Sequence, residues 1–244
     1  MSERIAKRLA RVGLCSRREA ERWILAGRVK VDGVRLISPA INVGDHDEIR
    51  VDGDLVGRPL QRRLWRYHKP INIITTRHDP RARQTVFETL PDELPRVISV
   101  GRLDFASEGL LLLTNVGELA QYLSHPKYGY LRRYRVQVNG SVDASTLDSL
   151  SKGISIRGTV YGPIAVKIEQ KGARFSWLRV ELKEGKNREI RRVMGHIGLK
   201  TQRLIRIGYG PFSLGRLAPG TVARVPERLI GPIVSYAVRY HEGR

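Results

Sequence analysis

The sequence predicts an α+β protein with a small basic N-terminal module and a larger domain built on a mixed or largely antiparallel β-sheet. Residues 1–60 contain two short helical patterns and a few short strand patterns. Residues 64–240 contain mostly strand patterns, with helices inserted between them. A stretch rich in Gly, Pro and charge separates the two parts, so we place a linker between about residue 53 and residue 63.

The charge of the chain indicates a polyanionic partner. Its 44 Lys and Arg residues against 24 Asp and Glu residues give a net charge of +20. A field of this sign attracts nucleic acid, and Arg, which outnumbers Lys, grips phosphates and stacks on bases. An anionic membrane fits less well, because the basic residues are spread through sequence that is expected to fold.

Several kinds of site are not expected. Cys15 is the only cysteine and the six histidines are scattered, so we expect no disulfide and no bound metal. The chain has neither GxGxxG nor GxxxxGK[ST], which disfavours a dinucleotide, methyl-donor or P-loop site. No apolar run approaches the roughly 20 residues of a membrane helix, and the charged start has no signal-peptide core. We expect a cytoplasmic monomer without membrane attachment or a small-molecule cofactor.

The N-terminal module is predicted to be two helices and a few short strands. Apolar residues repeat at helical spacing over 5–12, and Ser16 begins a capping-box pattern for a second helix that ends near Ala26. Strands are predicted at 28–31, 34–36 and 48–51, the first two joined by a tight turn at Asp32-Gly33.

The basic residues of this module gather in its first part. Residues 1–35 contain ten Lys or Arg against four Asp or Glu, whereas residues 36–60 contain two against five. The second helix and the hairpin should form one basic face suited to RNA phosphates, although a solvated helix surface would also explain the pattern. The residues predicted to bind RNA there are Arg17, Arg18, Arg22, Arg28 and Lys30.

The module resembles the alpha-L RNA-binding domain of the type found in ribosomal protein S four. The resemblance covers roughly residues 3–50 and includes Arg8-Leu9, Gly13, Ser16-Arg17-Arg18 and Gly27. It implies binding to structured RNA and says nothing about chemistry, because such domains are appended to unrelated enzymes.

In the larger domain the strand and helix patterns alternate. Strands are predicted at 64–70, 71–76, 97–100, 110–114, 131–138, 154–156, 160–161, 164–169, 177–183 and 201–207. Helices or helical turns are predicted at 85–90, 117–124 (capped by Asn115), 142–152, and from a cap at Asn187 to 197.

One polar turn lies between two of these strands. It contains Gly101-Arg102-Leu103-Asp104 and places a single carboxylate between two short apolar runs that the core should hold. An isolated Asp in a loop is most often a structural cap or an ion-pair partner. The alternative is a positioned reactive group, and with no other catalytic pattern in the chain an Asp nucleophile acting on RNA fits best.

The helix after Asn187 is the second unusual segment. Arg188, Arg191 and Arg192 share its polar face, and Arg188 stands at the N-terminal turn, where the helix dipole repels cations. A substrate phosphate or a carboxylate nearby would relieve this repulsion. An ordinary solvated basic face is the alternative.

These segments together resemble the RNA pseudouridine synthases, in the branch that has an N-terminal alpha-L domain and modifies ribosomal RNA. The resemblance runs through most of residues 64–220. It rests on Gly101-Arg102-Leu103-Asp104 with Ser107-Glu108-Gly109, on Tyr67-His68-Lys69-Pro70, on Arg133-Tyr134-Arg135-Val136, and on Asn187-Arg188-Glu189-Ile190-Arg191-Arg192. The last motif is similar to that of members acting on large-subunit rRNA.

The resemblance implies a role for several residues. Asp104 would be the nucleophile that attacks either C1′ of a flipped-out uridine or C6 of its ring, and no cofactor would be needed. Tyr134 would stack on the base and serve as general base, Arg191 would pair with Asp104, and Leu204 would pack beside the base. The residues expected to hold the RNA around this centre are Arg102, Lys186, Arg188 and Arg192.

Two other functions stay open on the sequence alone. The net charge and the alpha-L module would also suit a non-catalytic rRNA-binding or ribosome assembly factor. An RNA methyltransferase with the same appended module is disfavoured by the missing Gly-rich turn.

Overall fold

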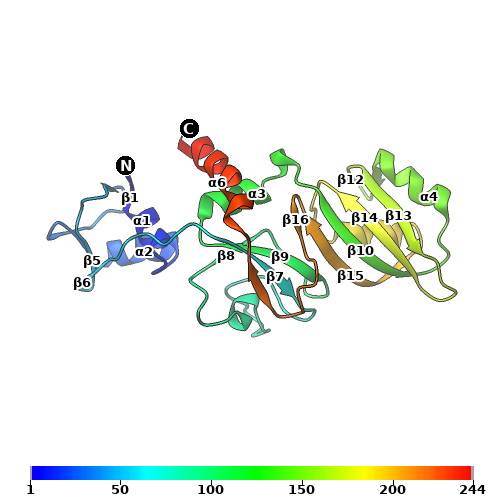
Figure 1. Ribbon diagram of the computed structural model, residues 1–244, viewed down its shortest axis with the longest axis horizontal. Helices are drawn as coiled ribbons and strands as arrows, with labels where there is room; N and C mark the ends of the chain where they lie inside the picture. Colours follow the sequence, from blue (N-terminus) through cyan, green and yellow to red (C-terminus); the bar gives the residue numbers. More distant parts are fainter. Residues whose placement is uncertain (1, 243–244) are drawn as a thin grey trace. The chain divides into compact units, whose positions relative to one another are not determined.

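The computed structural model describes the backbone of residues 2–242 and the side chains of residues 2–237 (Figure 1). The described chain divides into two compact units. The N-terminal unit contains the residues up to 63 together with 92–98 and 114–117, and the larger unit contains the remainder.

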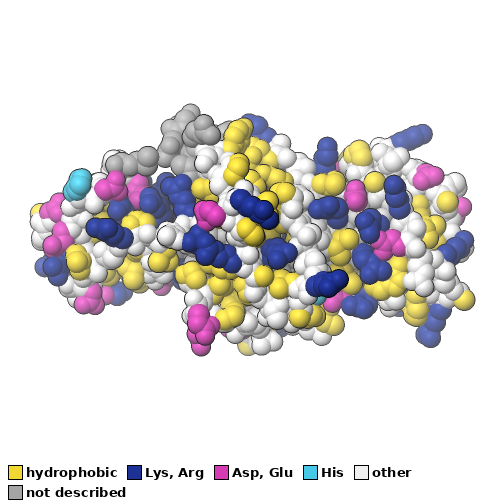
Figure 2. Space-filling view, in the orientation of Figure 1, with side chains coloured by type: hydrophobic (Ala, Val, Ile, Leu, Met, Phe, Trp, Pro, Cys, Tyr) yellow, Lys and Arg dark blue, Asp and Glu magenta, His cyan; other side chains and the backbone are white. Residues whose placement is uncertain are grey.

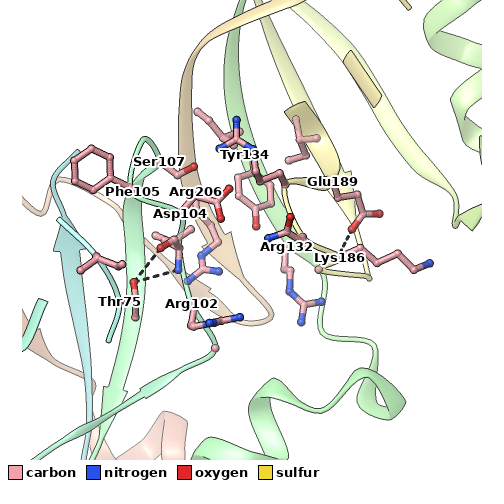
Figure 3. A pocket seen from close by; sticks show the side chains of 18 of the residues that line it. Thr75, Arg102, Asp104, Phe105, Ser107, Arg132, Tyr134, Lys186, Glu189 and Arg206 are labelled. Atoms are coloured by element: carbon pink, nitrogen blue, oxygen red, sulfur yellow. Dashed lines mark hydrogen bonds between the residues drawn. The ribbon is translucent and has the colours of Figure 1, made fainter. Parts of the chain in front are cut away.

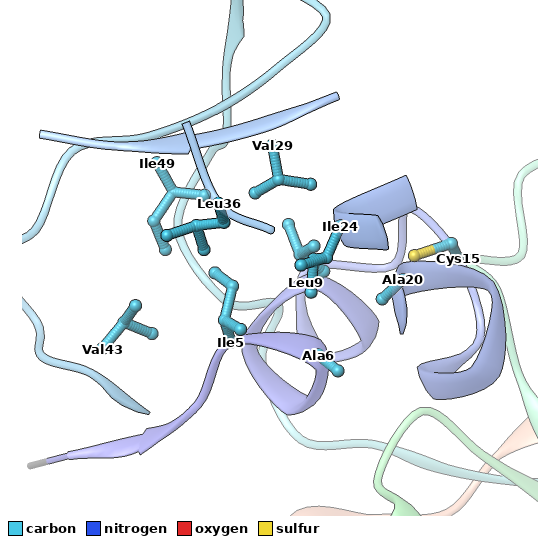
Figure 4. Packing of buried hydrophobic residues seen from close by; sticks show 10 residues of the cluster. All are labelled: Ile5, Ala6, Leu9, Cys15, Ala20, Ile24, Val29, Leu36, Val43 and Ile49. Atoms are coloured by element: carbon cyan, nitrogen blue, oxygen red, sulfur yellow. The ribbon is translucent and has the colours of Figure 1, made fainter. Parts of the chain in front are cut away.

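Two helices and short strands build the N-terminal unit around one small core. Helix α1 (Ile5–Arg11) and helix α2 (Arg17–Leu25) pack together. One sheet has the order β3 (Val34–Arg35), β2 (Val29–Val31), β5 (Ile49–Val51) and β6 (Asp54–Leu55), and β1 (Glu3–Arg4) pairs with β4 (Asn42–Val43). Figure 4 shows the apolar side chains that meet between helices and strands, among them Ile5, Leu9, Ile24 and Val29, all completely buried.

The local signals in this unit produce the predicted elements. Ser16 accepts the backbone N–H of Glu19 at 3.2 Å, and the Glu19 carboxylate accepts the N–H of Ser16 at 3.2 Å, which completes the capping box at the start of α2. Strand β6 was not predicted, since residues 54–55 fell in the expected linker. Asp52 and Gly53 both have positive φ (54° and 97°), the geometry of a tight hairpin turn, so the chain folds back onto β5.

The larger unit is built on a mixed sheet, which confirms the predicted fold class. Its main strand order is β13-β14-β10-β15-β9-β7-β17, with β16 beside β15 and β8 beside β9. Strands β15 and β9 are parallel, whereas β10 is antiparallel to both β14 and β15. The sheet strands are β7 (Leu64–Lys69), β8 (Ile98–Val100), β9 (Glu108–Thr114), β10 (Arg132–Asn139), β13 (Ile164–Gln170), β14 (Ser176–Leu182), β15 (Lys200–Tyr209), β16 (Phe212–Ser213) and β17 (Val222–Arg224).

Helices and short turns complete this unit. Helix α4 (Ala144–Ser149) packs on β13 (Figure 1), and helix α5 (Glu189–His196) contacts β15. A separate hairpin is formed by β11 (Ile154–Ile156) and β12 (Thr159–Tyr161). The helices are α3 (Gly117–Ser124), α4 (Ala144–Ser149), α5 (Glu189–His196) and α6 (Glu227–Glu242), with 3-10 turns at Val86–Thr89, Pro126–Tyr128 and Leu150–Lys152.

Some predictions of local structure are wrong. Residues 71–76 form no strand; Asn72 has φ 63°, which turns the chain away, and only an isolated bridge joins Ile74 to Thr85. Asn115 does not cap α3. Its side chain accepts the N–H of Arg63 at 2.8 Å and donates to the carbonyl of Gln61 at 2.7 Å, so it fastens the end of the expected linker instead.

Candidate active site

The loop between β8 and β9, residues 101–107 (the Asp104 loop), is held by its backbone. It begins at Gly101, whose φ of 67° favours glycine. The carbonyls of four consecutive residues, 104–107, accept hydrogen bonds. Lys69 Nζ donates to the carbonyls of Asp104 (3.1 Å) and Ser107 (2.8 Å), and the Ser107 N–H also donates to the Asp104 carbonyl (3.0 Å). The Asn72 N–H donates to the Phe105 carbonyl (2.8 Å), and Arg191 Nη2 donates to the Ala106 carbonyl (2.7 Å). The backbone on either side of the Asp104 carboxylate is therefore fixed from three directions.

Lys69 lies beneath this loop and is completely buried at the end of β7. Its ammonium donates to the carbonyls of Pro70 (2.9 Å), Asp104 and Ser107. Burial lowers the pKa of Lys69 to about 8, against the opposing effect of the negative charges of Asp104 and Glu108. Sequence reasoning noted Lys69 only as part of a motif. The sequence does offer one signal of a buried lysine, because Lys69 lies at the end of a mostly apolar strand pattern and just before Pro70.

A cavity of about 680 Å³ opens in front of the Asp104 loop. Its size suits a single flipped nucleotide. Among the described residues the Asp104 carboxylate makes no hydrogen bond or ion pair, and Figure 3 shows it in the cavity next to Tyr134. The predicted site residues that line the cavity are Asp104, Tyr134, Arg102, Leu204, Lys186 and Arg188.

The wall opposite the Asp104 loop comes from β10 and β15. In the sheet register Tyr134 stands between Val180 of β14 and Arg206 of β15, and its side chain is 8% exposed. Leu204 lies two residues before Arg206 on β15, so both side chains are on the same face of that strand, and Leu204 is 6% exposed. An aromatic ring and an aliphatic side chain thus form an apolar surface against which a base can pack.

Two buried arginines support this wall, and neither was predicted. Arg206 is 3% exposed and donates through Nε to the carbonyl of Leu110 at 2.7 Å; Arg132 is 9% exposed and donates to the hydroxyl of Tyr209 at 3.3 Å. Both guanidinium groups lie about 5 Å from the Tyr209 ring, at 5.2 and 5.1 Å. Because arginine stays charged when buried, the cavity has a positively charged floor.

Arg191 contacts the backbone of the loop rather than the Asp104 carboxylate. It comes from α5, is half-buried, and donates to the carbonyls of Ala106 (2.7 Å) and Thr201 (3.3 Å). No ion pair within 4 Å joins it to the Asp104 carboxylate in the part of the chain that the structure describes. Burial and the charge of the neighbouring Arg188 lower the pKa of Arg191, and the charge of Asp104 opposes this effect. Arg191 and Asp104 therefore interact electrostatically at longer range.

The start of α5 differs from the prediction. The cap residue is Arg188, with φ 51°, and not Asn187. The Glu189 carboxylate accepts the N–H of Lys186 at 2.8 Å, while Asn187 accepts a hydrogen bond from Arg192 at 3.1 Å. The strained left-handed conformation turns Arg188 to the cavity, where its side chain makes no hydrogen bond or ion pair to a described residue.

The remaining predicted cations fall in two places. Lys186 pairs with Glu184 at the cavity edge, and Lys and Arg side chains recur over the face of the larger unit seen in Figure 2. In the N-terminal unit, Arg28 pairs with Asp52 and lies 4.9 Å from the Trp23 ring, and this pairing lowers the pKa of Asp52. The other predicted RNA-binding residues of that unit are on α2 (Arg17, Arg18, Arg22) and β2 (Lys30).

Within the described residues, no helix is long and apolar enough to cross a membrane.

Comparison with known proteins identifies two families along the chain. The model of the S4 domain matches residues 3–49, and that of RNA pseudouridylate synthase matches residues 63–196. A Rickettsia felis protein named "Uncharacterized RNA pseudouridine synthase" is 46% identical over 228 residues, which cover 93% of this chain and 99% of the relative. The Salmonella typhi protein named "Ribosomal large subunit pseudouridine synthase B" is 42% identical over 228 residues, covering 90% of this chain and 77% of the relative.

A solved structure agrees at the level of the fold. The crystal structure of a pseudouridylate synthase superposes with a TM-score of 0.67 at 23% identity, covering 94% of this chain and 99% of that one.

Proposed function

Since this chain belongs to the RNA pseudouridine synthases and has an S4 domain at its N-terminus, we propose that it isomerises a specific uridine of large-subunit ribosomal RNA with Asp104 as the nucleophile. The observation that supports this most is the Asp104 loop. Its backbone is fixed by Lys69, Asn72 and Arg191, while the carboxylate itself stays unpaired in a cavity beside Tyr134.

The reaction needs no electrons or groups from outside. Asp104 adds either to C1′ of the ribose or to C6 of the base; the bond from C1′ to N1 breaks, the uracil turns, C1′ bonds to C5, and the bond to Asp104 breaks, which regenerates the carboxylate. The C5 proton leaves and N1 gains one, so atoms balance without a cofactor. Tyr134 lies on the far wall of the cavity, where it can stack on the ring and accept the C5 proton.

Positive charge surrounds the cavity that contains Asp104. The buried guanidinium groups of Arg132 and Arg206 line the cavity, and the Lys69 ammonium lies beneath the Asp104 loop. Buried positive charges act on an anionic group more strongly than charges in water do. Arg191 is a positioning residue in this mechanism, because it holds the loop through Ala106 O.

The assignment to large-subunit rRNA rests on relatives and on charge. The Salmonella typhi relative has that substrate in its name and is 42% identical over nine-tenths of this chain. The S4 domain, which corresponds to our proposed RNA-binding domain of residues 1–60, adds a second basic surface on α2. Residues 64–240 then form the catalytic domain, and the net charge of +20 suits a highly charged substrate.

Replacing the proposed nucleophile tests the function. Asp104→Asn should release no tritium from large-subunit rRNA labelled with [5-³H]uridine, and it should bind that RNA as tightly as the wild type does. Asp148→Asn, which alters an exposed carboxylate on α4, is the matched control and should keep full activity. Substantial tritium release by Asp104→Asn would sink the assignment. A wild type that binds RNA and releases none would favour the non-catalytic assembly factor.

A further inference from the structure

Asp79, Arg83 and Phe105 line one edge of the cavity, and Figure 3 shows Phe105 and Tyr134 on different sides of Asp104. We call this edge, together with residues 80–82 and the exposed Ile71, the outer lip. Phe105 is 39% exposed and Ile71 is 51% exposed, although large apolar side chains are normally buried. The two backbones adjoin, since Asn72, the residue after Ile71, donates its N–H to the carbonyl of Phe105 at 2.8 Å.

The Phe105 ring is held in this exposed position by a rigid backbone. Its own carbonyl and those of Asp104 and Ala106 are all hydrogen-bonded. Figure 3 shows the ring and the Asp104 carboxylate leaving the loop in different directions. Because these bonds fix the backbone at Phe105, they also fix the direction in which its side chain leaves the loop, and the ring is partly exposed to solvent there.

Residues 79–83 form a turn beside Phe105 that is closed by hydrogen bonds between Arg83 and Asp79. Arg83 donates to both carboxylate oxygens of Asp79, at 2.8 and 2.9 Å, and its own N–H donates to Asp79 at 3.0 Å. These bonds hold the pKa of Asp79 well below its usual range. The same Arg83 guanidinium lies 5.9 Å from the Phe105 ring, which ties the turn to the aromatic residue.

The turn leaves one cation uncompensated. Residues 79–83 contain Arg81 and Arg83 against a single acid, Asp79, which Arg83 already engages. Arg81 is exposed, and its side chain makes no hydrogen bond or ion pair to any described residue. An exposed aromatic ring, an aliphatic neighbour and a free guanidinium are complementary to a base, its ribose and its phosphate.

We propose that the outer lip binds the RNA strand adjoining the target uridine, with Phe105 stacked on the base of a flanking nucleotide and Arg81 at a phosphate. This inference rests on the proposed function and assigns residues to it. When a uridine leaves its stack to reach Asp104, the neighbouring base loses a stacking partner. Phe105, one residue from the nucleophile, replaces that partner and so favours the flipped state.

Stacking and charge predict different signatures in two variants. Phe105→Ala should lower kcat/KM for tritium release from [5-³H]uridine-labelled large-subunit rRNA by about 5- to 100-fold, the usual range for the loss of one aromatic stack. Phe105→Trp keeps an aromatic ring, so its kcat/KM should stay within about twofold of the wild-type value. Arg81→Ala should reduce the slope of log affinity against log salt concentration by about 1, and Phe105→Ala should leave that slope unchanged.

Matched controls separate the lip from general effects. Leu229→Ala removes a similarly exposed apolar side chain from α6, and Lys171→Ala removes an exposed cation from the loop after β13. Both should behave as wild type. Phe105→Ala with wild-type kinetics, equal losses in Phe105→Ala and Phe105→Trp, or an unchanged salt slope in Arg81→Ala would each overturn the proposal. Failure of the proposed function would look different, because the wild type itself would then release no tritium.

Discussion

Raising the pH through about 8 should remove the proton that Lys69 uses to hold the Asp104 loop. The ammonium is completely buried and donates to three carbonyls, at 2.9, 3.1 and 2.8 Å. Its pKa falls from 10.5 to about 8 because burial disfavours the charge. At about 1.4 kcal/mol for each pKa unit, burial makes the neutral amine roughly 3 kcal/mol more favourable than it is in water.

Activity and stability should respond to this titration in opposite directions. A neutral amine has two N–H donors, so above pH 8 at least one carbonyl of Pro70, Asp104 or Ser107 loses its partner and the loop loosens. Between pH 8 and 10.5 the unfolded chain binds more protons at Lys69 than the folded chain does. The contribution of Lys69 to the free energy of unfolding therefore rises with pH over that window, by up to roughly 3 kcal/mol.

The assay is the pH profile of single-turnover tritium release between pH 6.5 and 9.5, with thermal unfolding measured in parallel. The wild type should lose activity with one apparent pKa near 8, without a matching loss of stability. Lys69→Met has no proton to lose and removes charged hydrogen bonds worth about 1.5–3 kcal/mol each, so its rate should be about 10- to 100-fold lower and flat across pH 8.

Lys69→Arg keeps a charge that does not titrate in this range and should shift or abolish the alkaline fall. The same alkaline fall in the wild type and in both variants would refute the reasoning about Lys69, because the titrating group would then lie elsewhere.

Two further perturbations test the packing and the RNA surface. Gly109→Ala should lower the free energy of unfolding by about 2–4 kcal/mol, measured by urea titration, because φ is 105° there and a Cβ would clash with the carbonyl oxygen of Arg206; a variant as stable as wild type would mean that β9 and β15 pair less closely. Replacing Arg18 and Arg22 of α2 by Ala should reduce the salt slope of rRNA binding by about 2; an unchanged slope would place the phosphate contacts of this unit elsewhere.

The sequence was sufficient for features that depend on local pattern. The apolar runs on either side of Asp104 become β8 and β9, and Leu110 to Leu113 are completely buried because β9 lies inside the sheet. Ser16 begins α2 by the predicted capping box. Tyr134 falls on β10 and lines the cavity. In each case the deciding interactions lie within a few residues or follow from strand alternation.

Features that depend on distant partners were missed. Lys69 has its acceptors at Asp104 and Ser107, which are 35 and 38 residues away, so no local pattern could show what its charge holds. Arg206 shares the buried face of β15 with Leu204, where a charged residue is unexpected, and its partner is the backbone of Leu110 on the parallel strand. Residues 71–76 have a strand-like composition, but Asn72 turns the chain to reach the Asp104 loop.

Site-resolved mapping of pseudouridine in large-subunit rRNA tests the central claim most directly. Cells lacking this protein should show one uridine position unmodified. The wild-type gene should restore pseudouridine at that position, and the Asp104→Asn gene should not, although both proteins accumulate. Restoration by Asp104→Asn, or a complete pseudouridine map without the protein, would contradict the assignment of Asp104 as the nucleophile of an rRNA pseudouridine synthase.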